Sequence, residues 1–285
     1  MLRLLRPKQW TKNLLLFAAL VFAGKLFDPS ALLQAALAFV AFCLASSSVY
    51  VVNDLLDVER DRAHPEKRNR PIASGQVGTG AALVVAGVLT VAALGLSFSL
   101  ERAFGAATLV YLCLSHFYSF VGKNIVLLDT LLVAIGFVLR AVAGALAIDV
   151  PYSDWFVLCT LFVALFIALS KRKAELLAGG DDSGSRPVLE HYSVSSLTAF
   201  TGTSMAAAVI SYSLYVQDVI GRTHERYLLL FTVPFVILAI FRYYLLVENA
   251  GAGEKPEEIL LSDRPLQLCA LAFAALAVLA FYGGA

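Results

Sequence analysis

Charged residues are scarce in this sequence. Of its 285 residues only 15% are charged, whereas 59% are hydrophobic and the mean hydropathy is +0.78. A soluble domain carries about a quarter charged residues, so composition excludes an ordinary soluble domain. Several apolar stretches reach about 18 residues or more, the length that crosses ~30 Å of hydrocarbon. The sequence therefore predicts an all-α, multi-pass membrane protein.

Paired cysteines are also absent. The four cysteines stand alone within apolar stretches, at Cys43, Cys113, Cys159 and Cys269. None has the paired spacing of a zinc or redox site, and the four histidines share no spacing either. The sequence contains no nucleic-acid motif, low-complexity tail or soluble domain. These absences leave the polar segments between the apolar stretches as the places where chemistry is expected.

Nine membrane spans are predicted within a single catalytic domain over residues 1–285. They cover roughly 10–24, 31–53, 81–99, 104–121, 126–148, 153–170, 194–217, 227–247 and 266–282. The first is the weakest, because it also resembles a signal peptide. Cations before it (Arg6, Lys8 and Lys12) are more typical of a retained membrane-surface anchor.

Loop charge predicts the orientation. With the N-terminus inside, sixteen of the 22 lysines and arginines fall in cytoplasmic segments. The outer loops then hold only Lys25, Arg102, Arg222 and Arg226. By the positive-inside rule the N-terminus is cytoplasmic and, with nine spans, the C-terminus is outside. We therefore expect a multi-pass protein of the plasma (inner) membrane whose polar loops face the cytoplasm.

Four oxygen-bearing side chains cluster where the second expected span ends, at Asn53, Asp54, Asp57 and Asp61. Helical geometry places Asn53, Asp57 and Asp61 on one face, each four residues from the last. Neighbouring carboxylates repel each other unless a cation neutralises them. Mg²⁺ binds through one or two carboxylates and takes its other oxygens from water and substrate phosphates. The motif predicts a magnesium ion and a diphosphate, with Asp54 supporting; for Asp61, a solvated helix cap is the alternative.

Cationic side chains follow in the cytoplasmic loops. Lys67 and Arg70 come just after the acidic motif, Lys123 lies in the loop between spans four and five, and Lys171 opens the loop after span six. Any one of them could simply reflect the positive-inside rule. As a group beside a metal motif, they are expected to hold phosphates.

Arg140 lies well inside an apolar span. Such an arginine usually faces a water-filled cavity, and small residues around it allow close helix approach. Asp129 precedes it by eleven residues, about three helical turns, so both share roughly one face. A structural ion pair is the alternative for Arg140, and snorkelling to the cytoplasmic surface is the alternative for Arg242.

Together these motifs resemble the UbiA-type intramembrane prenyltransferases. That family implies nine helices around a cavity open to the cytoplasm and to lipid, with Mg²⁺-dependent handling of a diphosphate. One departure stands out, because the loop between spans four and five has a lysine and a single aspartate instead of a second aspartate-rich motif. The remaining motifs resemble the decaprenyl-phosphate phosphoribosyltransferase branch: Arg6 to Asn13, His64 to Lys67, Arg70 to Gly75, Gly136 to Gly144, Lys171 to Leu176 and Asp263 to Leu266.

The branch implies transfer of 5-phosphoribosyl from 5-phosphoribosyl 1-diphosphate to a polyprenyl phosphate, with release of pyrophosphate. The expected catalytic residues are Asn53, Asp57, Asp61 and Lys67. The expected substrate-binding residues are Lys12 and Tyr50 (by resemblance), Lys67, Arg70, Lys123, Asp129, Arg140 and Lys171. Arg140 and Lys171 would receive the lipid phosphate or the 5-phosphate. The nucleophile is already an anion, so no strong general base is expected.

Two other functions compete with this one. An aromatic prenyltransferase would use polyprenyl diphosphate as donor, but it would need a second carboxylate cluster. A lipid transporter without chemistry would be favoured by inverted repeats, and none is found. The sequence leaves open the lipid chain length, the downstream pathway, expected in cell-envelope glycan synthesis, and a homo-oligomer, which small-residue helix faces would support.

Overall fold

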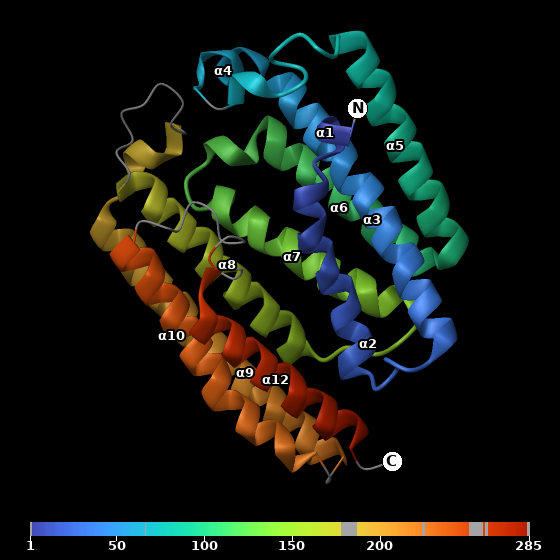
Figure 1. Cartoon of the computed structure of the whole chain (residues 1–285), viewed down its shortest axis with the longest axis vertical. Coiled ribbons are helices and arrows are strands. Elements are labelled where there is room, and N and C mark those ends of the chain that lie inside the picture. Colours follow the sequence, from blue (N-terminus) through green and yellow to red (C-terminus); the bar gives the residue numbers. More distant parts are fainter. Residues whose placement is uncertain are drawn as a thin grey trace. The chain divides into compact units, whose positions relative to one another are not determined.

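The protein, represented by a computed structural model, is helical. The structure describes residues 2–65, 67–177, 187–223, 226–250, 259 and 262–283, and no strand occurs among them (Figure 1). The chain divides into two compact units, the first extending to Pro151 and the second beginning at Tyr152. The predicted all-α membrane architecture is confirmed.

The first unit is built around one long helix, α3. Its elements in order are α1 (Leu2–Leu5), the 3₁₀ helix η1 (Pro7–Phe17), α2 (Ala18–Phe22), α3 (Pro29–Leu56), α4 (Val58–Ala63), η2 (Lys67–Asn69), α5 (Thr79–Leu100), α6 (Arg102–Phe120), η3 (Gly122–Asn124) and α7 (Leu128–Ala147). Helix α3 packs against α5, α6 and η1. At its centre the Phe42 ring lies 5.1 Å from Tyr111 and 5.8 Å from Phe104.

The ends of α3 follow from its sequence. Asp28 caps the start, its carboxylate accepting the Ser30 N–H at 2.9 Å, and Pro29 occupies a first-turn position that needs no donor. The apolar run ends at Asn53, and the helix stops at Leu56. Asp57 has φ −96° and ψ 9°, which separates α3 from the short α4. The acidic motif therefore lies across a helix junction.

The first predicted span, 10–24, is not a single α-helix. It consists of η1 followed by α2, and in η1 Asn13 and Leu16 are buried. Gly144 of α7 explains how this backbone fits, because a Cβ there would lie 2.2 Å from the Leu16 carbonyl oxygen. The close contact between η1 and α7 packs this segment against the rest of the first unit.

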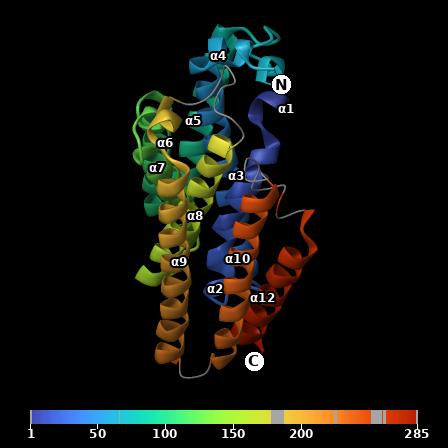
Figure 2. The same cartoon turned by 90° about the vertical axis from the view of Figure 1, so that its left-hand side faces the viewer.

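The second unit contains two packed helix pairs. Its elements are α8 (Asp154–Leu177), η4 (Pro187–His191), α9 (Val194–Thr223), η5 (Tyr227–Phe231), α10 (Thr232–Ala250) and α12 (Arg264–Tyr282). Helix α8 packs along α9, and α10 packs along α12 (Figure 2). The Phe166 and Tyr243 rings meet edge to face at 5.5 Å within its core. Arg242, which the sequence left open, pairs with Asp263 through Nη2 and Oδ2 at 2.8 Å.

Eight helices within the described ranges are long and apolar enough to cross a membrane. They correspond to the second to ninth predicted spans, with η5 and α10 together forming the eighth. The outer face of α5 is typical, because Leu83, Val88 and Val91 each expose more than half of their surface. Such a face suits hydrocarbon, which agrees with the predicted multi-pass membrane protein.

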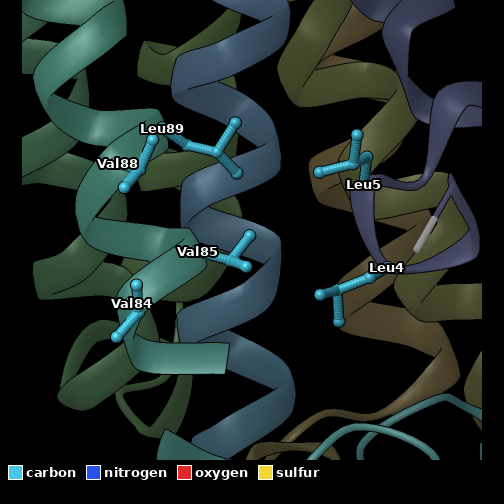
Figure 3. A pocket seen from close by; sticks show the side chains of 6 residues that line it. All are labelled: Leu4, Leu5, Val84, Val85, Val88 and Leu89. Atoms are coloured by element: carbon cyan, nitrogen blue, oxygen red, sulfur yellow. The ribbon is translucent and has the colours of Figure 1, made fainter. Parts of the chain in front are cut away.

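A groove of about 300 Å³ lies between α1 and α5 in the first unit. Leu4 and Leu5 line one side of it, and Val84, Val85, Val88 and Leu89 line the other (Figure 3). Every lining side chain is aliphatic, so the groove offers no group for metal binding or phosphate recognition. The polar chemistry lies at the end of α3.

Candidate active site

Two polar clusters meet where α3 gives way to α4. In one, a pair of arginines holds Asp54 and Asp61. In the other, Lys123 reaches Asp57, which also contacts Asn53. The cations Arg6, Arg70 and Lys123 come from the N-terminal segment, the α3–α5 connection and the α6–α7 turn. Three parts of the chain that are distant in sequence thus converge on one motif.

Arg70 links two deeply buried carboxylates of the acidic motif. Its Nη1 lies 2.6 Å from Asp61 Oδ2 and 3.2 Å from Asp54 Oδ1, and Arg6 Nη2 contacts the same Asp54 oxygen. The side chain of Asp54 is 2% exposed and that of Asp61 is 5% exposed. Buried carboxylates require hydrogen-bonded countercharges, and the two guanidinium groups supply both. This cluster has equal positive and negative charge.

Local folding explains the position of Arg70. The Pro71 carbonyl accepts the Val77 N–H at 2.9 Å, and Gly75 adopts φ +75° within this turn. Ile72 is buried with Val51 of α3, which fixes the turn against the helix. The predicted motif from Arg70 to Gly75 is therefore a turn that presents one guanidinium to α3 and α4.

Arg6 is positioned by a helix break. It adopts the left-handed conformation, with φ 52°, between α1 and η1, and Pro7 begins the next helix. Ser47 Oγ of α3 donates to the Leu5 carbonyl at 2.9 Å and accepts from Trp10 Nε1 at 3.0 Å. The Arg6 guanidinium lies 5.2 Å from the Tyr50 ring centre, within cation–π distance. The N-terminal segment is thus fastened to α3.

Asp57 receives its cation from the α6–α7 turn. Lys123 Nζ lies 2.6 Å from Asp57 Oδ1, while Asn53 Nδ2 lies 3.1 Å from Asp57 Oδ2. Lys123 belongs to η3, and Gly122 beside it packs so closely on α7 that a Cβ would lie 2.2 Å from Leu132 Cδ1. The turn conformation therefore directs the lysine toward the end of α3.

This pairing divides the predicted metal motif. Asn53 and Asp57 come together as expected, whereas Asp61 joins Asp54 through Arg70. The physical reason is Arg70, whose planar guanidinium contacts both of these carboxylates. In the described part of the chain, no group of three or more His, Cys, Asp or Glu side chains could hold a metal ion. The Asn53 amide and the Asp57 carboxylate still suit Mg²⁺, which takes few protein oxygens and completes its shell with phosphate and water.

Arg140 has three protein partners. Its Nε donates to Asn13 Oδ1 at 3.0 Å, Nη1 to the Gly136 carbonyl at 3.1 Å and Nη2 to Tyr111 Oη at 2.8 Å. The guanidinium also lies 4.8 Å from the Tyr111 ring centre and 5.3 Å from that of Phe137. No carboxylate among the described residues forms an ion pair with it, so the alternative of a structural ion pair finds no support. Arg140 is a buried cation held by neutral groups.

The other predicted residues lie on separate elements. Lys12 is half-buried on η1, Tyr50 half-buried on α3, and Asp129 fully buried in the first turn of α7. Lys67 is half-buried in η2, where its N–H donates to His64 Nδ1 at 3.4 Å. Lys171 belongs to α8 in the second unit.

The sequence matches a known protein family over most of its length. The UbiA prenyltransferase family profile matches residues 14–257. The chain belongs to the UbiA prenyltransferase family.

Relatives of this UbiA protein match it over nearly its whole length. It is 39% identical to the decaprenyl-phosphate phosphoribosyltransferase of Corynebacterium glutamicum, covering 99% of this chain and 86% of that protein. It is 40% identical to the enzyme of the same name from Mycolicibacterium smegmatis, covering 96% and 89%. Its fold resembles that of a UbiA homolog from Archaeoglobus fulgidus bound to GPP and Mg²⁺, with a TM-score of 0.75, 20% identity and 98% of each chain covered.

Several site residues of this UbiA protein were not predicted from the sequence. Arg6 was predicted as part of a membrane-surface anchor and of a motif, but not as the partner of the buried Asp54, and Asn13 and Tyr111 were not assigned to Arg140. A buried carboxylate implies a cation somewhere, but the sequence alone cannot say which. In the second unit Lys173 is buried and pairs with Glu248, beside the Tyr244 ring. In the sequence, Lys173 was identified only as part of the motif from Lys171 to Leu176.

Proposed function

We propose that this protein transfers the 5-phosphoribosyl group of 5-phosphoribosyl 1-diphosphate to a polyprenyl phosphate and releases pyrophosphate. Relatives about 40% identical over nearly the whole chain are named decaprenyl-phosphate phosphoribosyltransferases, which supports this transferase activity. The observation that carries the proposal is the contact between Lys123 and Asp57. The α6–α7 turn brings a cation to the acidic motif, whereas an aromatic prenyltransferase was expected to have a second carboxylate cluster.

The diphosphate end of the donor is assigned to Asn53 and Asp57. Their oxygens would hold Mg²⁺, and when bound this ion would neutralise the charge that develops on the departing pyrophosphate. Asp61 and Asp54 act through Arg70, which they hold beside the motif. Lys67 and Lys123 are assigned to donor phosphates because a lysine is a flexible point charge with three donors.

The remaining cations are assigned to the ribose 5-phosphate and the lipid phosphate. Lys12 and Tyr50 are proposed to line the donor pocket, with Asp129 supporting. Arg140 and Lys171 are proposed for the lipid phosphate or the 5-phosphate. A guanidinium has five N–H groups, and the three bonds of Arg140 leave two of them without an acceptor among the described residues. That spare capacity supports a role for Arg140 in anion binding.

The reaction needs orientation more than proton transfer. A lipid phosphate oxygen attacks the anomeric carbon of ribose, the bond from that carbon to the diphosphate oxygen breaks, and the electron pair leaves with pyrophosphate. The nucleophile is anionic, so no side chain has to remove a proton. Holding two anions against their mutual repulsion in a reactive geometry would supply much of the acceleration.

The membrane arrangement is part of the proposal. The eleven residues of η1 span roughly 22 Å at the 3₁₀ rise. The five of α2 add roughly 8 Å. Their sum of roughly 30 Å equals the hydrocarbon thickness, which supports a ninth span despite the short segment. We place the N-terminus and the acidic motif on the cytoplasmic side of the inner membrane, beside a cavity open to cytoplasm and lipid. The whole chain acts as one catalytic domain, in a monomer or a homo-oligomer.

A transfer assay tests the proposal. Membranes containing the protein are incubated with Mg²⁺, polyprenyl phosphate and donor labelled in the ribose, and label in the lipid fraction is counted. Asp57→Asn should remove transfer, whereas Glu59→Gln should retain it, since Glu59 is 80% exposed and, among the described residues, its ion pair is with Arg62 in the same helix. Transfer to an aromatic acid from polyprenyl diphosphate, with none from the phosphoribosyl donor, would refute the proposal.

A further inference from the structure

A single oxygen of Asp57 carries its ion pair. Lys123 Nζ lies 2.6 Å from Oδ1, and the other oxygen, Oδ2, accepts from Asn53. A divalent cation bound through this carboxylate needs an oxygen lone pair that faces it. An ammonium group at 2.6 Å takes up one lone pair of Oδ1 and adds repulsion between two positive charges. Lys123 and a metal ion would therefore compete for Oδ1.

Of the three carboxylates, Asp57 holds its cation least firmly. Its side chain is 21% exposed, against 2% for Asp54 and 5% for Asp61. Asp54 and Asp61 bind planar guanidinium groups, which are anchored by a second carboxylate or a stacked ring, whereas Asp57 binds one flexible lysine. Partly exposed pairs are weak, and deeply buried ones resist separation. Exchange of the cation is therefore easiest at Asp57.

The Lys123 backbone is fixed while its side chain can move. The Asn124 N–H donates to the Val121 carbonyl at 3.0 Å, and the Ile125 N–H donates to the Gly122 carbonyl at 3.2 Å. Close packing of Gly122 on Leu132 holds the same turn against α7. The four-carbon stem of the lysine lets the ammonium leave Asp57 and remain beside the acidic motif. A phosphate bound there would be within its reach.

We propose that Lys123 competes with the divalent cation for Asp57 and that, once displaced, its ammonium binds the donor diphosphate. The competition rests on the contact between Lys123 and Asp57, and the binding of the diphosphate rests on the proposed function. The exchange keeps the charge balanced, because the carboxylate never lacks a countercharge and the lysine gains the diphosphate as its new partner. Metal and donor binding would thus be coupled through one side chain.

Metal binding without any substrate tests the competition between Lys123 and the divalent cation. Purified protein in detergent is titrated with Mn²⁺ as a paramagnetic stand-in for Mg²⁺, and free Mn²⁺ is measured by electron paramagnetic resonance. A partly exposed ion pair is worth up to about fivefold in an equilibrium constant, so Lys123→Met should tighten Mn²⁺ binding by up to about fivefold. Lys123→Arg, which keeps the charge, should bind Mn²⁺ no more tightly than the parent protein.

Two control variants separate this effect from others. Arg222→Gln removes one positive charge from a side chain that is 72% exposed, and it should leave Mn²⁺ affinity unchanged. Asp57→Asn should abolish the Mn²⁺ site in both the parent and the Lys123→Met background. The melting temperature of each variant, measured in the same detergent, confirms that it is folded.

Donor binding gives the second readout. Lys123→Met should raise the KM for 5-phosphoribosyl 1-diphosphate while it tightens Mn²⁺ binding, and a purely structural role would weaken both. Unchanged, weaker or undetectable Mn²⁺ binding in folded Lys123→Met overturns the competition, and so does tighter Mn²⁺ binding in Lys123→Arg. Tighter Mn²⁺ binding in Lys123→Met with an unchanged KM overturns the binding of the diphosphate by Lys123. Failure of the proposed function is distinct, because it would appear as no phosphoribosyl transfer by the parent protein whatever its Mn²⁺ affinity.

Discussion

Asp54 and Asp57 are three residues apart, yet the structure gives them different tasks. Asp54 is buried between Arg6 and Arg70, whereas Asp57 is partly exposed and pairs with the single cation of Lys123. Asparagine has nearly the same shape as aspartate and removes only the charge. We predict that Asp54→Asn lowers stability and largely spares activity. Asp57→Asn should largely spare stability and remove activity.

The size of the stability loss in Asp54→Asn follows from the burial of its ion pairs. Removing one partner of a buried ion pair costs about 3–5 kcal/mol. In Asp54→Asn the new amide would keep an oxygen acceptor, Arg70 keeps Asp61 at 2.6 Å, and water reaches both guanidinium groups, which are about a quarter exposed. We therefore expect about 2 kcal/mol, or a melting temperature roughly 4–8 °C lower. For Asp57→Asn, we expect at most about 1 kcal/mol.

Thermal melting in detergent and transfer assays below the melting temperature measure the two effects. Asp57→Asn should reduce transfer by about 100-fold or more, the scale of losing one electrostatic group at the reacting centre. Asp54→Asn should keep at least about a tenth of the parent rate. Equal melting temperatures for both variants, or greater loss of activity in Asp54→Asn, would refute the division of the motif.

Two further predictions concern packing and acid stability. Gly144→Ala should lower stability by about 2 kcal/mol, because its Cβ would meet the Leu16 carbonyl. Gly87→Ala should instead raise stability by about 0.5–1 kcal/mol, because a Cβ at Gly87 would have nothing within 4 Å. Melting temperatures of the two variants check this, and a stable Gly144→Ala would contradict the close approach of η1. The hydrogen bond from Arg242 lowers the pKa of Asp263 below its ordinary 3.8. That pair therefore stabilises the fold above about pH 4 and ceases to do so as the pH falls through the lowered pKa. Melting curves between pH 5 and 3 should show an acid-dependent loss that is smaller in Asp263→Asn, and identical pH profiles would contradict it.

Much of the fold was predictable because hydrocarbon imposes a simple rule on sequence. Eight predicted spans match long helices, and their ends follow from polar residues such as Asp28, Glu101 and Asp263, which cap the helices after them. The first segment differs because its backbone conformation depends on tertiary contacts. Gly144 lies 128 residues from Leu16, and nothing near Leu16 in the sequence indicates that η1 will press against α7.

The candidate site was predictable in its residue types but not in its pairings. Spacing along one helix brought Asn53 and Asp57 together correctly, since that contact is local. The link from Asp54 to Asp61 depends on the turn that carries Arg70, and the link from Asp54 to Arg6 depends on a left-handed break before Pro7. Helical spacing cannot reveal such contacts, because they arise where the chain leaves the helix.

The central claim is that the bond between the anomeric carbon and the diphosphate breaks and that the lipid receives the phosphoribosyl group. Two donors, one labelled in the 5-phosphate and one in the β-phosphate, test it directly when each is incubated with the protein, Mg²⁺ and polyprenyl phosphate. The 5-phosphate label should enter the lipid fraction, and the β-phosphate label should stay in water as pyrophosphate. Lipid that gains the β-phosphate label, or neither label, would contradict the account.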